Sequence, residues 1–146
     1  MRKVIIKYKK LSDNAKAPFR KHSDDAGFDL TATSVKYHEA DGKYEYGVGL
    51  AFDIPKGYWG DLRPRSSIHK TGMVLSNSCG VLDRNYRGEV KSFFYKVGKH
   101  VKPYEVGDRI LQLIIANADP EEVEFVEVDD LEETNRGIGG FGSTGK

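Results

Sequence analysis

The chain has 146 residues, a length typical of one domain with its own buried core. Lys and Arg number 23 and Asp and Glu 22, so the net charge is +1, without the basic excess of a general nucleic-acid binder. The single cysteine, Cys79, excludes an intrachain disulfide, and no apolar stretch is long enough to span a membrane. We therefore expect a cytoplasmic protein (or a nuclear one, if eukaryotic) with no nucleic-acid or membrane partner.

The elements expected along the chain are mostly short strands. Apolar residues alternate with polar or small ones from Tyr44 to Asp53, which predicts a strand with one buried face. A short helix is expected at 66–70, and the segment 80–89 is predicted to form a hairpin. Further strands are expected at 4–8, 28–33, 58–62, 73–75, 89–97, 109–116 and 123–128. Many short strands favour an all-β sandwich, jelly roll or barrel.

The last eleven residues differ from the rest in composition. Five of them are glycines, namely Gly137, Gly139, Gly140, Gly142 and Gly145. We expect one domain over 1–135, followed by a flexible glycine-rich segment at 136–146 that is either simply disordered or ordered by a ligand. Residues 140–146 match the start of a P-loop pattern, but a P-loop follows a strand and opens a helix, and the sequence ends at Lys146.

Two segments carry groups that could bind ions. Asp24, Asp25 and Asp29 surround a glycine turn, where carboxylates could hold a hard cation or could simply begin a strand. Arg65, with Ser66 and Ser67, precedes the short helix. Guanidinium, hydroxyl and backbone N–H groups at such a place form an anion site, although either serine could instead only cap the helix.

Two further segments leave alternatives open. A hairpin at 80–89 could present Asp83 and Tyr86 to a ligand, or could be an ordinary solvated tip. Gln112 lies inside an apolar strand, and a buried amide needs a partner, which could be a ligand or neighbouring backbone.

Taken together and in this order, these segments resemble the five motifs of the trimeric dUTPase family. The motifs lie at 26–32, 64–72, 80–89, 107–113 and 136–145, so the resemblance covers most of the chain. Ser67, Asn85 and Leu111 depart from common family choices without removing a group that the chemistry needs.

The resemblance implies a jelly-roll-like β-barrel (a β-prism) that assembles as a homotrimer with sites shared between subunits. It implies hydrolysis of dUTP to dUMP and pyrophosphate, which limits dUTP and supplies dUMP for thymidylate synthesis. Asp83 would activate water for attack on the α-phosphate. Tyr86 would pack under the deoxyribose and reject UTP, and Asn77 would read the uracil edge. The implied substrate contacts are Arg65, Ser66, Ser67, Asn77, Gly80, Val81, Tyr86, Gln112, Arg136, Phe141, Gly142, Ser143 and Thr144.

The implied cofactor is Mg²⁺, which would bridge phosphate oxygens and keep much of its water. Asp29 would meet this ion through water, or would instead be a structural partner of a nearby arginine. Two other functions remain open. One is dCTP deamination, which needs an acid/base Glu in the pocket. The other is binding of a regulatory protein by a nucleotide-responsive trimer.

Overall fold

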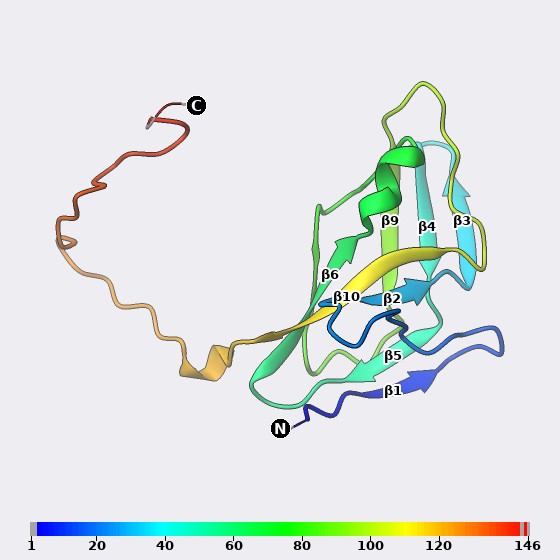
Figure 1. Ribbon diagram of the computed structural model, residues 1–146, viewed down its shortest axis with the longest axis horizontal. Helices are drawn as coiled ribbons and strands as arrows, with labels where there is room; N and C mark the ends of the chain where they lie inside the picture. The colour runs from blue at the N-terminus through cyan, green and yellow to red at the C-terminus, as the bar shows by residue number, and fades with distance from the viewer. Residues whose placement is uncertain (1–2, 144, 146) are drawn as a thin grey trace.

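Ten strands form two four-stranded sheets and a two-stranded ribbon in residues 3–143 and 145, the part of the chain that the computed structural model describes (Figure 1). The first sheet has the order β2-β10-β6-β8. Its strands are β2 (Phe28–Thr31), β10 (Arg109–Asn117), β6 (Tyr58–Pro64) and β8 (Gly80–Leu82).

The second sheet has the order β3-β4-β9-β7, and all pairings in the fold are antiparallel. Its strands are β3 (Ser34–His38), β4 (Lys43–Gly47), β9 (Lys91–Lys96) and β7 (Met73–Leu75). The ribbon pairs β1 (Lys7–Lys10) with β5 (Leu50–Asp53), and the short 3-10 helices are η1 (Ser66–Lys70) and η2 (Pro120–Glu122). The expected all-β, jelly-roll-like class and the helix at 66–70 are confirmed. None of the helices in the described ranges is long and apolar enough to cross a membrane.

The core lies between the two sheets. Leu30 and Ile110 of the first sheet and Tyr46 and Phe94 of the second have no exposed surface. Tyr46 and Phe94 meet edge to face, with ring centroids 5.5 Å apart. Burying a large apolar side chain contributes about 1.5–3 kcal/mol, so this layer supplies a large share of the stability of the barrel that carries the site.

The single strand expected at 44–53 is wrong, because the chain turns a corner inside it. Gly49 adopts a φ of +66°, and β4 and β5 on either side belong to the second sheet and the ribbon. Residues 46–52 are all buried, so the expected alternation of one buried and one exposed face is also absent there. At a corner inside the barrel, odd and even residues along the chain are both buried. The alternating sequence pattern does not reveal such a corner.

The hairpin expected at 80–89 is wrong as well. β8 pairs with β6 at the margin of the first sheet, whereas β9 lies between β4 and β7 in the second. The segment between them therefore crosses from one sheet to the other. Two smaller differences concern β3 and β1. β3 is not expected from the sequence because four of its five residues are exposed, and β1 begins at Lys7 rather than at residue 4.

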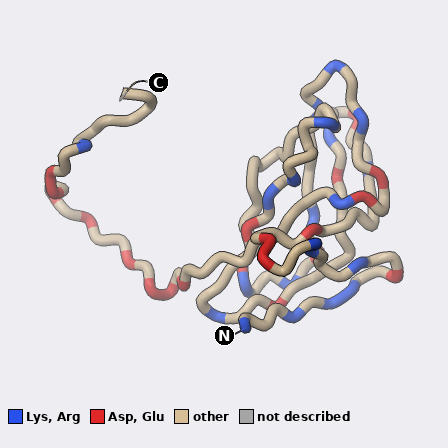
Figure 2. The backbone as a smooth tube through the Cα atoms, in the orientation of Figure 1, with Lys and Arg blue, Asp and Glu red and all other residues tan. Residues whose placement is uncertain are grey.

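After β10 the chain leaves the barrel as an extended arm, residues 118–143 (Figure 1). The expected strand at 123–128 is wrong for the described chain, where these residues form no strand and Phe125 is 96 % exposed. A strand needs a hydrogen-bonding neighbour, and the arm lies against none here. Acidic side chains dominate the arm from Asp119 to Glu133 (Figure 2). The division of the chain at 135/136 stays a prediction.

Candidate functional site

A pocket of about 260 Å³ opens where the chain passes from β8 toward β9. It brings together five residues that the sequence analysis had placed in one site, Asn77, Gly80, Val81, Asp83 and Tyr86. Its remaining lining residues are Leu62, Leu82, Glu89, Val90 and Lys91. The pocket thus combines apolar walls with an amide, carboxylates and an aromatic ring, the mixture typical of small-molecule sites.

The loop after β8 presents its two central side chains to solvent. Asp83 follows the last residue of β8, and the Tyr86 N–H donates to the Asp83 carbonyl at 3.1 Å, which closes a turn. The Tyr86 hydroxyl donates to the Glu89 carbonyl at 3.1 Å, and the ring lies where a Gly88 side chain would otherwise stand. The carboxylate of Asp83 and the face of Tyr86 are therefore accessible to a ligand.

Asn77 reaches the pocket from a tight turn between β7 and β8. The Cys79 N–H donates to the Asn77 carbonyl at 2.6 Å, and Ser78 has a φ of +61°, which few non-glycine residues adopt. Gly80 packs on Leu62, and its missing side chain brings the strand backbone close to the Asn77 amide. The turn thus sets the Asn77 amide beside the backbone of β8.

A second pocket of about 370 Å³ is mainly basic. It is lined by Arg65, Ser67, Lys70, Thr71, Lys102, Pro103, Tyr104, Gly107, Asp108 and Arg109. Four cationic side chains against one carboxylate favour an anionic ligand. The interpretation of Ser66 or Ser67 as a helix cap is wrong, because the N-cap position of η1 is Arg65 and no side chain caps the helix. Burial raises the pKa of Tyr104, so its hydroxyl stays protonated in this pocket.

Asp29 of β2 joins Arg109, on the neighbouring strand β10, to Arg65, which directly follows β6. Its Oδ1 accepts from Arg65 Nε at 3.2 Å and its Oδ2 from Arg109 Nη1 at 3.2 Å. Both carboxylate oxygens are thus engaged, and the described residues contain no group of three acidic, His or Cys side chains that could hold a metal ion. The Gln112 amide also has a protein partner, since Nε2 donates to the Pro64 carbonyl at 3.0 Å.

The glycine-rich segment stands away from the barrel (Figure 1), and none of its described residues lines either pocket. It is folded into local turns, in which Arg136 Nε donates to the Gly139 carbonyl at 2.9 Å and the Ser143 N–H donates to the Gly140 carbonyl at 3.0 Å. The ring of Phe141 is fully exposed, and Gly142 has a φ of +82°. Thr144 lies outside the described residues.

The root of the arm is tied to the loop that carries Asp83. Glu121 of η2 pairs with Arg84 at 3.3 Å and with Lys56 at 2.7 Å. The hydrogen bond from Lys56 lowers the pKa of Glu121, so this carboxylate stays charged. The arm therefore begins beside the first pocket and then departs from it.

Three charged residues in or behind the first pocket were not predicted as site residues. Glu89 and Lys91 line it, and Arg87 braces the loop at its back. Lys91 pairs with Glu45 at 3.6 Å, and Glu45 also accepts from His38 at 3.0 Å, a hydrogen bond that lowers the Glu45 pKa. Glu89 belongs to the third motif, but the sequence alone gave it no partner.

Fold and pockets together define an all-β protein with one small-molecule pocket of mixed polar and apolar walls and a second, basic pocket that suits an anion. The dUTPase family model matches residues 13–145. The deoxyuridine 5'-triphosphate nucleotidohydrolase of Yarrowia lipolytica is 40 % identical over 143 residues, covering 97 % of this chain and 90 % of that protein. The enzyme of the same name from Nautilia profundicola is 37 % identical, covering 97 % and 99 %.

Solved structures agree with the sequence relatives. The dUTPase of Staphylococcus bacteriophage 80alpha, solved with dUPNHPP, matches with a TM-score of 0.81 and 28 % identity, over 97 % of this chain and 99 % of that one. The chain belongs to the dUTPase family, which confirms the resemblance carried by the five motifs.

Proposed function

We propose that this chain hydrolyses dUTP to dUMP and pyrophosphate, and so limits dUTP and supplies dUMP for thymidylate synthesis. The family membership supports the reaction. The observation that carries the assignment of the site is that Asp83, Tyr86 and Asn77 line one pocket although they come from two different loops.

Asp83 acts as the general base. Its exposed carboxylate orients a water molecule and accepts its proton as the water oxygen attacks the α-phosphorus. A bond forms between that oxygen and phosphorus, and the bond from phosphorus to the oxygen that bridges toward the β-phosphate breaks. Pyrophosphate leaves with that bridging oxygen, and dUMP remains in the pocket.

Tyr86 and Asn77 select the nucleoside. The Tyr86 ring lies under the deoxyribose and leaves no room for a 2′-hydroxyl, so UTP is rejected. Asn77 pairs with the uracil edge, with backbone groups of Gly80 and Val81 beside it. A base with the wrong edge would leave these polar groups without partners, which discriminates strongly.

Phosphate binding is assigned to Arg65, Ser66, Ser67 and Gln112. The pocket that contains Arg65 and Ser67 shares no lining residue with the pocket that contains Asp83. This separation supports a site that combines the nucleoside pocket of one subunit with the phosphate residues of another. We therefore propose a homotrimer with sites shared between subunits.

The glycine-rich segment acts as a lid over bound nucleotide. Phe141 stacks on uracil, and Arg136, Ser143, Thr144 and the Gly142 backbone contact phosphate. The full exposure of the Phe141 ring supports this role, because a large apolar ring gains most from a partner that removes it from water. Lid closure also excludes bulk water from the reaction.

Mg²⁺ is part of the proposal. When bound, it would offset the negative charge of the phosphate oxygens. Phosphate and water would supply most of its ligands. The residues of the chain fit a Mg²⁺ ion that enters with the substrate better than an ion held by protein ligands alone. The reason is that both oxygens of Asp29 already accept hydrogen bonds from Arg65 and Arg109. Of the two roles considered for Asp29, its contacts support the structural one.

We also keep the cytoplasmic or nuclear location in this proposal, since a single thiol, Cys79, suits a reducing compartment.

The test is pyrophosphate release from dUTP, dCTP, dTTP and UTP in parallel, with and without Mg²⁺, for the natural chain and for Asp83→Ala. We expect fast, Mg²⁺-dependent release from dUTP alone, and a loss of about 10²–10⁴-fold in Asp83→Ala with an unchanged melting temperature. Ammonia released from dCTP would instead identify a deaminase. Binding of dUTP without turnover in the natural chain would support a nucleotide-responsive binding protein.

A further inference from the structure

We infer that Arg87 and Glu89 are positioning residues that hold the loop of Asp83 and Tyr86 against β5 and the corner before it. The inference rests on the proposed roles of Asp83 and Tyr86. It adds two side chains that touch no reacting atom but set where those two groups stand.

The loop needs such support because no β-ladder holds it. β8 and β9 belong to different sheets, so residues 83–89 run between the sheets without paired strands in the described structure. The turn from Tyr86 N–H to the Asp83 carbonyl is local and does not tie the loop to the barrel. Segments with few buried contacts open more readily than core strands, and a misplacement of about 1 Å can cost about a hundredfold in rate.

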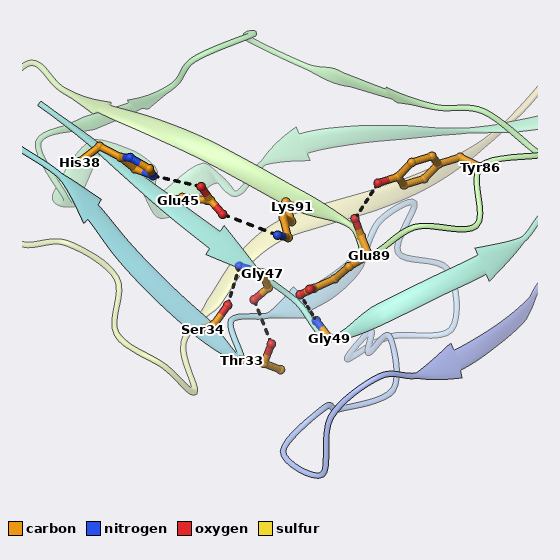
Figure 3. A network of polar contacts seen from close by, with 9 residues as sticks. All are labelled: Thr33, Ser34, His38, Glu45, Gly47, Gly49, Tyr86, Glu89 and Lys91. Carbon is orange, nitrogen blue, oxygen red and sulfur yellow. Dashed lines mark hydrogen bonds and ion pairs between the residues drawn. The ribbon is translucent and has the colours of Figure 1, made fainter. Parts of the chain in front are cut away.

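Glu89 ties the end of the loop to the corner between β4 and β5 (Figure 3). Its Oε2 accepts from the Gly49 N–H at 3.1 Å, and its side chain occupies the space that Gly47 leaves open. The backbone continues this attachment, since the Val48 N–H donates to the Val90 carbonyl at 3.1 Å and the Val90 N–H donates to the Leu50 carbonyl at 2.9 Å.

The same residue fixes the ring of Tyr86 (Figure 3). The Glu89 carbonyl accepts from the Tyr86 hydroxyl at 3.1 Å, so the ring is attached to the residue whose side chain is attached to the barrel. This chain of contacts leads from the buried corner through Glu89 to the ring that we place under the deoxyribose. Glu89 therefore influences the selection against UTP without contacting the sugar.

Arg87 braces the loop from within. Its Nη1 lies 2.7 Å from the Arg84 carbonyl and 3.2 Å from the Phe52 carbonyl, and its Nη2 donates to Asp53 Oδ1 at 2.8 Å. The guanidinium thus joins the residue beside Asp83 to two consecutive residues of β5. A lysine has a single nitrogen and cannot reproduce this fork.

The contacts of Glu89 also provide a way to distinguish a positioning role from an acid/base role. Its Oε2 serves as an acceptor for a backbone N–H, and a glutamine oxygen can accept the same bond but cannot take up a proton in catalysis. Glu89→Gln is therefore expected to stay within about threefold of the natural chain, whereas Glu89→Ala removes the acceptor and the filling of the corner.

The experiment compares Glu89→Ala, Glu89→Gln, Arg87→Ala and Arg87→Lys with Asp83→Ala and with a control, Asp41→Asn. Asp41, in the turn between β3 and β4, pairs with Lys43 of β4 at 3.3 Å and lines neither pocket. The Asp41→Asn variant therefore tests the effect of breaking an ion pair elsewhere in the protein. For each variant, kcat and KM for dUTP and UTP are measured, with amide hydrogen exchange over residues 83–89.

We expect Glu89→Ala, Arg87→Ala and Arg87→Lys to lower kcat for dUTP about ten- to a hundredfold. In these variants the ratio of kcat/KM for dUTP to kcat/KM for UTP should decrease, and the amide hydrogens of residues 83–89 should exchange faster. Asp41→Asn and Glu89→Gln stay near the natural chain. If Glu89→Gln is as impaired as Glu89→Ala, Glu89 is an acid/base group and the inference is wrong. It is also wrong if both alanine variants match the natural chain while Asp83→Ala is inactive. Full activity in Asp83→Ala would instead overturn the proposed site itself.

Discussion

Asp29 and Arg65 form an ion pair of 3.2 Å that joins β2 to the residue between β6 and η1. The pair orients the guanidinium that lines the basic pocket, because Arg65 Nη1 also donates to the Arg109 carbonyl at 3.3 Å. Under the proposed function, Asp29 therefore acts on phosphate binding through arginine rather than through a metal ion.

Asp29→Asn is expected to raise KM for dUTP about tenfold, because Arg65 and Arg109 lose the charge that orients them; a tenfold change corresponds to about 1.4 kcal/mol. The Mg²⁺ concentration that gives half-maximal activity should not change. Steady-state kinetics over a Mg²⁺ titration measures both. A large increase in the Mg²⁺ requirement would show that Asp29 belongs to the metal site after all.

Truncation after Asn135 is expected to leave the barrel folded and to abolish most turnover. Residues 136–143 make no hydrogen bonds to the barrel in the described structure, so their removal costs no core contacts. Thermal unfolding and pyrophosphate release measure the two effects. A truncated chain that turns over dUTP at the natural rate would argue against a lid.

Gly88→Ala is expected to reduce the preference for dUTP over UTP. A methyl group at Gly88 would occupy the position of the Tyr86 ring, which must then move away from its bond with the Glu89 carbonyl. Competition between the two nucleotides in one reaction measures the ratio directly. An unchanged ratio would mean that Tyr86 does not set the selection against the 2′-hydroxyl.

Alkaline pH is expected to destabilise the barrel through Tyr46. Burial raises the pKa of Tyr46 above its ordinary value of 10.0, and its hydroxyl donates to the Tyr104 carbonyl at 2.8 Å. Below about pH 10 the phenol is neutral in both states. As pH rises further, the unfolded chain releases this proton and the folded chain does not, so the free energy of unfolding falls.

Tyr46→Phe is expected to lower the free energy of unfolding by about 1 kcal/mol at pH 7, because the hydrogen bond to the Tyr104 carbonyl is lost. Above pH 10, the free energy of unfolding of this variant should depend less on pH. Urea unfolding from pH 7 to pH 11 compares the two chains. Equal pH dependence would show that Tyr46 ionises in the folded barrel as easily as in the unfolded chain.

The order of the five motifs along the chain was enough to identify the family and the candidate residues of its site. Asp83 and Tyr86 are close in sequence within the third motif, so one short loop brings both side chains to the same pocket. The many short strands predicted along the chain likewise sufficed for the all-β class. The strand expected at 123–128 failed, since alternation describes a face and not the neighbour that a strand must pair with.

The sequence by itself determined the all-β class and, through the five motifs, the family, because these depend on residue types and short spacings. Only the tertiary structure decided that Asp29 meets Arg109, 80 positions away, and that Glu89 meets Gly49, 40 positions away. Such contacts follow from strand register and from the crossing between sheets. Packing of the whole barrel fixes both, and no local pattern in the chain encodes them.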